Sequence, residues 1–271
     1  MELPVSGVGV QFRVPDGNDD LAILEAAGGP VEQALTILPR LAHLGRHNGA
    51  EAESVRGGRT QWKDLTVTDF ETALLGLRRY LFGDRAGCIV RAASHKCGVP
   101  MELQFSISSF LAEVKPAIPR RVEESHGHEG WFKFTGHNEE QARFRLPSVE
   151  DQAEVLGHPD AANHLARRCI QAANLSSRTR VRVERAMEAM APSVSRPLVG
   201  QCSDCGESLT MTLHVPRLVV DELRISASGV HEDVHAIAST YHWDEASILA
   251  MPQSRRQAYA AAIRHQAGET R

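Results

Sequence analysis

The cysteine pair at Cys202 and Cys205 has the most specific chemical pattern in the sequence. Two residues separate the thiols, and Gly206 follows the second one. This spacing lets a tight turn aim both sulfur atoms at one ion, and a glycine after the second cysteine permits the left-handed conformation that closes such a turn. The sequence CSDCG therefore predicts a zinc knuckle, which is half of a tetrahedral zinc site.

Cys88 and Cys97 supply the other two ligands of the predicted site. Cys97 is followed by Gly98, so its local pattern repeats that of the knuckle. The interval between Cys88 and Cys97 is longer than the roughly two to four residues of a compact knuckle, and His95 within it can replace one thiolate as a ligand. The alternative is that Cys88 and Cys97 are ordinary buried thiols.

A short β segment follows each cysteine pair. Residues 101–107 alternate apolar and polar side chains, and residues 209–215 read LTMTLHV, which is typical of half-buried strands. A four-ligand zinc ion would therefore join two β segments that are far apart in the chain. The fifth cysteine, Cys169, lies on the apolar side of an expected helix, and we predict that it is a core residue.

The sequence HEDVH at His231–His235 matches the H-E-x-x-H pattern of zinc metallopeptidases. In that pattern two histidines one helical turn apart hold the metal, and the glutamate, here Glu232, activates water. Asp233 places a second carboxylate inside the turn, and His242 comes one position too late to complete a known ligand spacing. We interpret the motif as a solvated helix flank, and a zinc metallopeptidase is the alternative function.

Two other polar clusters are less specific. Three histidines between His126 and His137 could bind a metal ion, although polar loops collect histidines by chance. The segment Arg167–Arg185 contains six arginines and could bind phosphate or an acidic protein. Its neighbours Glu184 and Glu188 favour a solvated, ion-paired face instead.

Composition restricts the class of function. The chain has 271 residues, of which 42% are hydrophobic and 24% charged, so an ordinary globular protein is expected. A net charge of −4 and only 5% aromatic residues disfavour a nucleic-acid-binding ribbon, the weakest of the three function classes. No apolar run is long enough to span a membrane, and the N-terminus lacks a signal-peptide pattern, so the expected location is the cytoplasm.

The periodicity of apolar residues predicts an α+β protein that is mostly helical, with a small antiparallel element of zinc-ribbon type and a C-terminal helical bundle. Thr66 or Thr68 is expected to begin a helix that ends at Phe82. The stretch 178–190 fits either a helix or a strand, because arginines alternate with threonine and valine. We divide the chain into an extended N-terminal arm (1–18), an N-terminal helical region (19–85), a β-rich region with the first cysteine pair (86–147), a helical region (148–200), and the second knuckle with the C-terminal helices (201–271).

The sequence predicts that the C-terminal region forms short helices packed against one another. We expect a helix over 228–241 that buries an apolar stripe ending at Tyr241, and we expect Asp244 to cap the next helix. A proline then breaks the chain before the last helix, and Arg255 and Arg256 are expected near the exposed start of that helix.

Several short motifs follow one another in order from about residue 20 to residue 266. They are Leu77-Arg78-Arg79, Leu81-Phe82-Gly83-Asp84, Cys97-Gly98, Met101-Glu102-Leu103, Phe144-Arg145-Leu146-Pro147, Cys202–Gly206, Val234-His235, Ala238, Tyr241, Trp243, Glu245, Ile248-Leu249, Arg255-Arg256 and Tyr259. In this order they resemble the baseplate hub and hub-assembly proteins of contractile phage tails and of related phage-tail-like injection systems.

The resemblance implies a structural or assembly role in the baseplate, paired cysteine knuckles and no catalysis. The implied partners are hub, spike or wedge proteins, and the implied location is the cytoplasm during assembly or the assembled particle. The sequence departs from the family pattern at Cys88 and Cys97, which are spread apart. This departure weakens the zinc prediction more than it weakens the resemblance.

Overall fold

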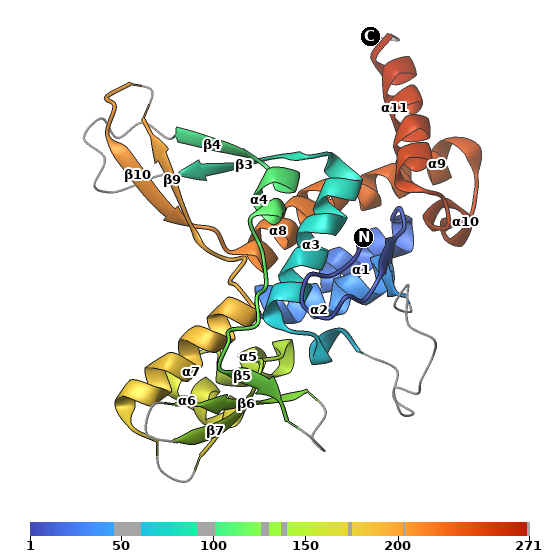
Figure 1. Cartoon of the computed structure of the whole chain (residues 1–271). Helices are drawn as coiled ribbons and strands as arrows, with labels where there is room; N and C mark the ends of the chain where they lie inside the picture. Colours follow the sequence, from blue (N-terminus) through green and yellow to red (C-terminus); the bar gives the residue numbers. More distant parts are fainter. Residues whose placement is uncertain are drawn as a thin grey trace. The chain divides into compact units, whose positions relative to one another are not determined.

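The computed structural model describes residues 1–45, 61–90, 101–125, 130–136, 140–172, 175–202 and 204–269. It is mostly helical with small antiparallel sheets, which confirms the predicted α+β class (Figure 1). The chain forms two compact units. Unit 1 comprises Met1–Val10 and Leu44–Val215, and unit 2 comprises Gln11–His43 and Pro216–Arg271.

Unit 1 contains most of the strands. Its elements are the 3-10 helix η1 (Trp62–Asp64), α3 (Val67–Phe82), β3 (Arg85–Val90), β4 (Met101–Ser106), α4 (Ile107–Ala112), β5 (Val122–Glu124), β6 (Trp131–Thr135), β7 (Gln141–Arg145), α5 (Val149–Val155), α6 (Ala161–Cys169), β8 (Ile170–Gln171), α7 (Ser177–Met190), β9 (Pro197–Gln201) and β10 (Ser208–Thr212). Strands β5, β6, β7 and β8 form one antiparallel sheet in this order, and β3–β4 and β9–β10 are separate hairpins.

Helix α7 covers one face of the four-stranded sheet. Its buried side chains Val183, Ala186 and Met190 pack in one cluster with Phe134 and Phe144 of the sheet. These three helix residues are spaced three and four positions apart, which places them on one face of the helix. Phe134 of β6 and Phe144 of β7 point to the same face of the sheet, toward the helix. The stretch 178–190, for which the sequence allowed either a helix or a strand, is helical. Only a helix places Val183, Ala186 and Met190 together on the face that packs on the sheet.

Helix α3 is the central helix of unit 1. Thr66 caps its N-terminus by accepting a hydrogen bond from the Asp69 backbone N–H, and Gly83 ends it with a positive φ of 87°, as predicted from the sequence. Glu71 on this helix is buried and accepts hydrogen bonds from the backbone N–H of Ser195 at 2.9 Å and from its hydroxyl at 2.7 Å. Since Ser195 Oγ also accepts from the Val215 N–H at 3.1 Å, both ends of the β9–β10 hairpin are tied to α3.

The base of the β9–β10 hairpin also contacts the element that follows the β3–β4 hairpin. The Arg196 guanidinium lies 4.3 Å from the centroid of the Phe110 ring and pairs with Glu113. Phe110 belongs to α4, which continues directly from β4. The two hairpins therefore start from a common point, and Figure 1 draws them extending in the same direction.

Unit 2 is helical, with one short pair of strands where the chain passes between the units. Its elements are β1 (Val10–Phe12), α1 (Gly17–Glu25), α2 (Pro30–Leu41), β2 (Ala42–Leu44), α8 (Val215–Ala227), α9 (Val230–Tyr241), α10 (Glu245–Leu249) and α11 (Gln253–Glu269). Asp244 caps α10, and Ile248 and Leu249 are buried, as expected. Tyr241 is 39% exposed rather than buried, because it lies at the C-terminal end of α9 and stacks, at a centroid distance of 5.2 Å, on Trp243, which is exposed to the same degree.

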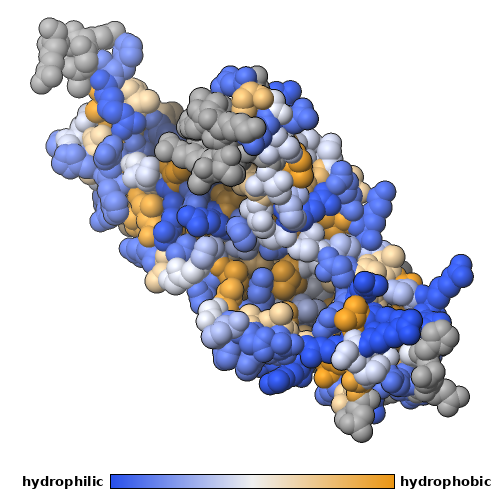
Figure 2. Space-filling view, turned by 90° about the vertical axis from the view of Figure 1, so that its left-hand side faces the viewer, coloured by the Kyte–Doolittle hydropathy of each residue, from blue (hydrophilic) through white to orange (hydrophobic). Residues whose placement is uncertain are grey.

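No helix among the described residues is long and apolar enough to cross a membrane. On the face drawn in Figure 2, hydrophobic residues lie in small groups among hydrophilic ones. The apolar residues are instead concentrated in the cores of the two units.

Gly17 in α1 lies where no side chain fits. A Cβ atom on this residue would stand 2.8 Å from the Leu249 Cα and 2.9 Å from Arg256 Nη1. Alanine normally stabilises a helix relative to glycine, but overpacking against backbone commonly costs about 1–3 kcal/mol. We therefore expect Gly17→Ala to lower the melting temperature, measured by circular dichroism. An unchanged or higher melting temperature would contradict the close packing of α1 on α10.

Candidate functional site

The turn between β9 and β10 contains the two cysteines of the predicted zinc knuckle. The Cys202 N–H donates to the Glu207 carbonyl and the Gly206 N–H donates to the Cys202 carbonyl, both at 2.9 Å. The Asp204 N–H points at Cys202 Sγ at 3.4 Å. Gly206 has a φ of +72°, which is the left-handed conformation expected from the sequence.

The structure describes three of the four predicted metal ligands, and they lie in different surroundings. Cys202 is buried and Cys205 is exposed, at the two ends of the knuckle turn. Cys88 lies in β3, where its backbone pairs with Leu103 of β4. Cys97 and the alternative ligand His95 lie outside the described residues. Within the described ranges, no group of three or more ligating side chains lies close enough to hold a metal ion, so the four-ligand site stays a prediction.

The HEDVH motif lies on α9, and the helix presents its members to different surroundings. His231, Glu232 and His235 are exposed, whereas Asp233 is buried. The two histidines therefore lie on the solvated flank of the helix. The histidine cluster in the loops falls at 126–128 and 137, outside the described residues.

A buried ion cluster surrounds Arg256 in unit 2. Arg256 and Asp20 are each 1% exposed and form an ion pair, and Arg256 Nε lies 3.6 Å from Asp233 Oδ2. Arg264 pairs with the other Asp233 oxygen at 3.2 Å. Arg256 was expected near an exposed helix start, and that expectation is wrong because α11 turns this residue toward α1 and α9. The signal available in the sequence was its spacing from Ala260 and Ile263, which places all three on one helix face.

The two adjacent aspartates of α1 differ in their electrostatic surroundings. Burial raises the pKa of Asp20, and the hydrogen bond from Arg256 offsets only part of this rise. Burial also acts on Asp19, but hydrogen bonds from Arg13 and from the Asp16 backbone lower the pKa of this carboxyl below its usual value. Arg40 adds a second cation at 3.3 Å from Asp19. Two consecutive carboxylates are therefore satisfied by two separate sets of arginines.

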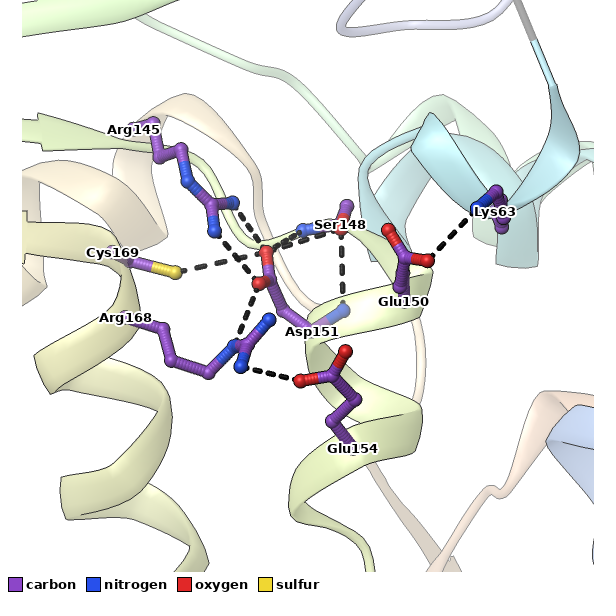
Figure 3. Close-up of polar contacts among 8 residues, drawn as sticks. All are labelled: Lys63, Arg145, Ser148, Glu150, Asp151, Glu154, Arg168 and Cys169. Atoms are coloured by element: carbon purple, nitrogen blue, oxygen red, sulfur yellow. Dashed lines mark hydrogen bonds and ion pairs between the residues drawn. The ribbon is translucent and has the colours of Figure 1, made fainter.

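Asp151 is the centre of a second network, in unit 1 (Figure 3). It lies in the first turn of helix α5, where it completes a capping box by accepting from the Ser148 N–H at 3.0 Å, and it pairs with Arg145 at the end of β7. Arg168 of α6 donates to the same carboxylate at 3.0 Å, and Cys169 Sγ lies 3.9 Å away. Burial opposes ionisation of Asp151, but hydrogen bonds from Arg145, the Ser148 backbone and Arg168 lower its pKa below the usual range. One side chain thus joins a strand and two helices.

Cys169 is a core residue, as predicted. It is fully buried, and burial raises the pKa of its thiol to about 11. The thiol is therefore protonated near neutral pH, when a nucleophile or metal ligand would need the thiolate.

A groove of about 500 Å³ runs between α6 and α7. Apolar side chains such as Leu165, Ile170 and Met187 line it together with Arg180, Glu184 and Glu188. Arg180 is engaged within the groove, because it pairs with Glu184 at 3.0 Å and donates to Asn163 at 2.5 Å. Arg180 and Glu184 in the groove therefore neutralise each other.

The chain matches no protein-family model, no curated protein and no solved structure. The turn at Cys202–Gly206 is the described feature that bears most directly on function.

Proposed function

We propose that this protein is a non-enzymatic structural or assembly component of the baseplate of a contractile tail or contractile injection system. It would act through protein–protein contacts with hub, spike or wedge proteins, in the cytoplasm during assembly or within the assembled particle. The observation that supports the proposal most directly is the turn at Cys202–Gly206. The Asp204 N–H to Cys202 Sγ contact and the left-handed Gly206 support a zinc knuckle, at the position where the resemblance to the hub and hub-assembly proteins implies one.

The proposed zinc ion has a structural role. Cys202 and Cys205 would bind it through the knuckle, and Cys88 and Cys97 would supply the remaining ligands. Thiolates in sets of four are typical of closed structural zinc sites. Because the two hairpins start from the common contact of Arg196 with Phe110, a zinc ion would tie their far ends together. In small zinc peptides such binding contributes on the order of 10 kcal/mol of folding free energy.

The cysteine variants test the zinc site. We expect Cys202→Ser and Cys205→Ser each to reduce bound zinc from about one ion per chain to almost none, and to lower the melting temperature, because a tetrahedral site needs all four ligands. Zinc is measured by inductively coupled plasma mass spectrometry on the purified full chain. Cys169→Ala is the matched control and should retain its zinc, since Cys169 lies in the separate Asp151 network. Wild-type zinc content in Cys202→Ser would contradict the proposed site.

The assembly role is tested by recovering the protein from its native host during particle assembly, with cross-linking. We expect sheath, tube, hub or spike proteins in the recovered complex. Recovery of the protein alone, with zinc lost from His231→Ala or His235→Ala but kept in Cys202→Ser, would overturn the proposal in favour of the metallopeptidase. In that case Glu232→Gln would abolish hydrolysis of a peptide substrate.

A further inference from the structure

Helix α7 divides its side chains among three faces. The first face packs on the sheet through residues such as Val183 and Ala186. The second lines the groove toward α6 through Arg180 and Glu184. The third carries Arg178, Arg182 and Arg185, whose spacing of four and three residues places them in one row about 10 Å long.

The arginines of this row differ from the other arginine of the same helix. Arg180 has an acidic partner, Glu184, at 3.0 Å. Among the described residues, no carboxylate lies within ion-pair distance of Arg178, Arg182 or Arg185. Like charges three and four positions apart on a helix repel one another, so the row is unfavourable in isolation. A partner that neutralises it would gain from relief of this repulsion.

A basic loop begins next to the C-terminal end of α7. The Ala117 N–H donates to the Ala189 carbonyl at 2.8 Å, so the loop before β5 begins next to the C-terminal end of α7. Farther along, the Arg121 carbonyl accepts from the Thr135 N–H at 3.2 Å, next to Gly136. Gly136 in turn lies against Thr179, because a Cβ on it would stand 3.1 Å from Thr179 Cγ2. The loop therefore begins at the C-terminal end of α7 and ends at the edge strand of the sheet that α7 covers.

This loop adds three cations to the arginine row. Lys115, Arg120 and Arg121 are exposed, and the described residues offer them no ion pair. Together the six side chains form what we name the basic strip. It consists of Lys115, Arg120, Arg121, Arg178, Arg182 and Arg185. The whole chain has a net charge of −4, so the strip is a local feature and not a consequence of an overall basic composition.

Two large apolar side chains accompany the strip. Val181 is 45% exposed and lies three residues after Arg178 and four before Arg185. Ile118 in the loop is 66% exposed. A phosphate backbone offers nothing that would cover exposed aliphatic side chains, whereas an amphipathic protein segment does.

We infer that the basic strip binds an acidic segment of a partner protein, one that presents carboxylates in a row with apolar side chains among them. The carboxylates of the partner segment would pair with the cations of the basic strip, and its apolar side chains would pack on Val181 and Ile118. This inference goes beyond the baseplate proposal and does not require zinc, because the strip is made by α7 and the loop at 115–121 rather than by the hairpins.

The test uses the full chain and two fluorescent probes. The first is a short peptide of alternating glutamate and leucine, and the second is a duplex DNA of similar net charge. We expect wild-type protein to bind the peptide more tightly than the DNA. The triple variant Arg178→Glu, Arg182→Glu, Arg185→Glu should lose at least about tenfold in peptide affinity, and wild-type binding should weaken as salt is raised.

Matched variants separate the strip from overall charge and from misfolding. Arg143→Glu, Arg167→Glu, Arg255→Glu makes the same change in net charge at exposed arginines outside the strip, and we expect less than about a twofold loss. The triple glutamine variant of the strip keeps helix-forming side chains and should lose affinity in the same direction, by a smaller factor. Equal losses in the strip and control variants, or tighter binding of the DNA than of the peptide, would overturn the inference.

Discussion

Replacing Arg256 by alanine is expected to lower the free energy of unfolding by about 3–5 kcal/mol, because it leaves buried carboxylates without their cation. Asp20 is 1% exposed and loses its ion pair, while the Gln253 amide stays 3.4 Å from its other oxygen. Asp233 keeps the half-exposed Arg264 but loses the buried guanidinium. Chemical denaturation followed by circular dichroism measures the change.

The neighbouring residue provides the control for Arg256. Arg255→Ala removes the same side chain one position earlier, where it is exposed and lies over the Tyr259 ring at 5.7 Å. Its cost should stay within about 1 kcal/mol. If both variants unfold at the same denaturant concentration, the buried cluster does not stabilise unit 2.

The effect of Arg256→Ala should depend on pH in a defined direction. Burial already holds the pKa of Asp20 above its unfolded value, and loss of Arg256 raises it further. A carboxyl with a raised pKa in the folded state destabilises the fold when it is ionised, and this cost disappears as the pH falls through the folded pKa. The difference between wild type and variant should therefore be largest near neutral pH and decrease in acid.

Replacing Asp151 by asparagine is the second substitution with a large expected effect, about 3 kcal/mol. An amide keeps the shape of the side chain but removes the charge that Arg145 and Arg168 contact, and it weakens the N-terminal cap of α5. The pKa of Asp151 is lowered in the folded state, so its stabilisation is complete above the unfolded pKa, near 3.8, and is lost as the pH falls through the folded value. Denaturation at neutral and acidic pH measures both effects.

Glu154→Gln is the matched control for Asp151. It removes a carboxylate from the same helix that pairs with the same Arg168, but at a half-exposed position. Exposed ion pairs contribute about 0–1 kcal/mol, so a small loss is expected. A loss as large as that of Asp151→Asn would show that total charge, rather than burial and hydrogen bonding, stabilises this region.

Two helix caps and the left-handed glycine after Cys205 could be predicted from the sequence, although Thr68 was an alternative to Thr66. Thr66 and Asp244 cap the helices that they were expected to cap, and Gly206 takes the left-handed conformation after Cys205. Each of these features depends on hydrogen bonds between residues two to five positions apart. Local side-chain chemistry is enough to specify such bonds.

The sequence did not show which charged side chains are buried or which distant residues they contact. Arg256 was expected at an exposed helix start, yet it pairs with Asp20 at a separation of 236 residues. Glu71 reaches Ser195 across 124 residues, and nothing near either residue in the sequence points to the other. A charged residue on an apolar helix face is compatible with solvent or with burial, and only the presence of a distant partner decides between them.

The sequence by itself thus determined the mostly helical α+β class, the helix caps and the knuckle turn, because these follow from contacts along a few neighbouring residues. Only the tertiary structure decided that Asp233 of the HEDVH motif is buried next to Arg256, and that the loop at 115–121 begins at the C-terminal end of α7. The physical reason is that burial and charge neighbourhood depend on which distant elements pack together, and the free energy of that packing is a property of the whole fold.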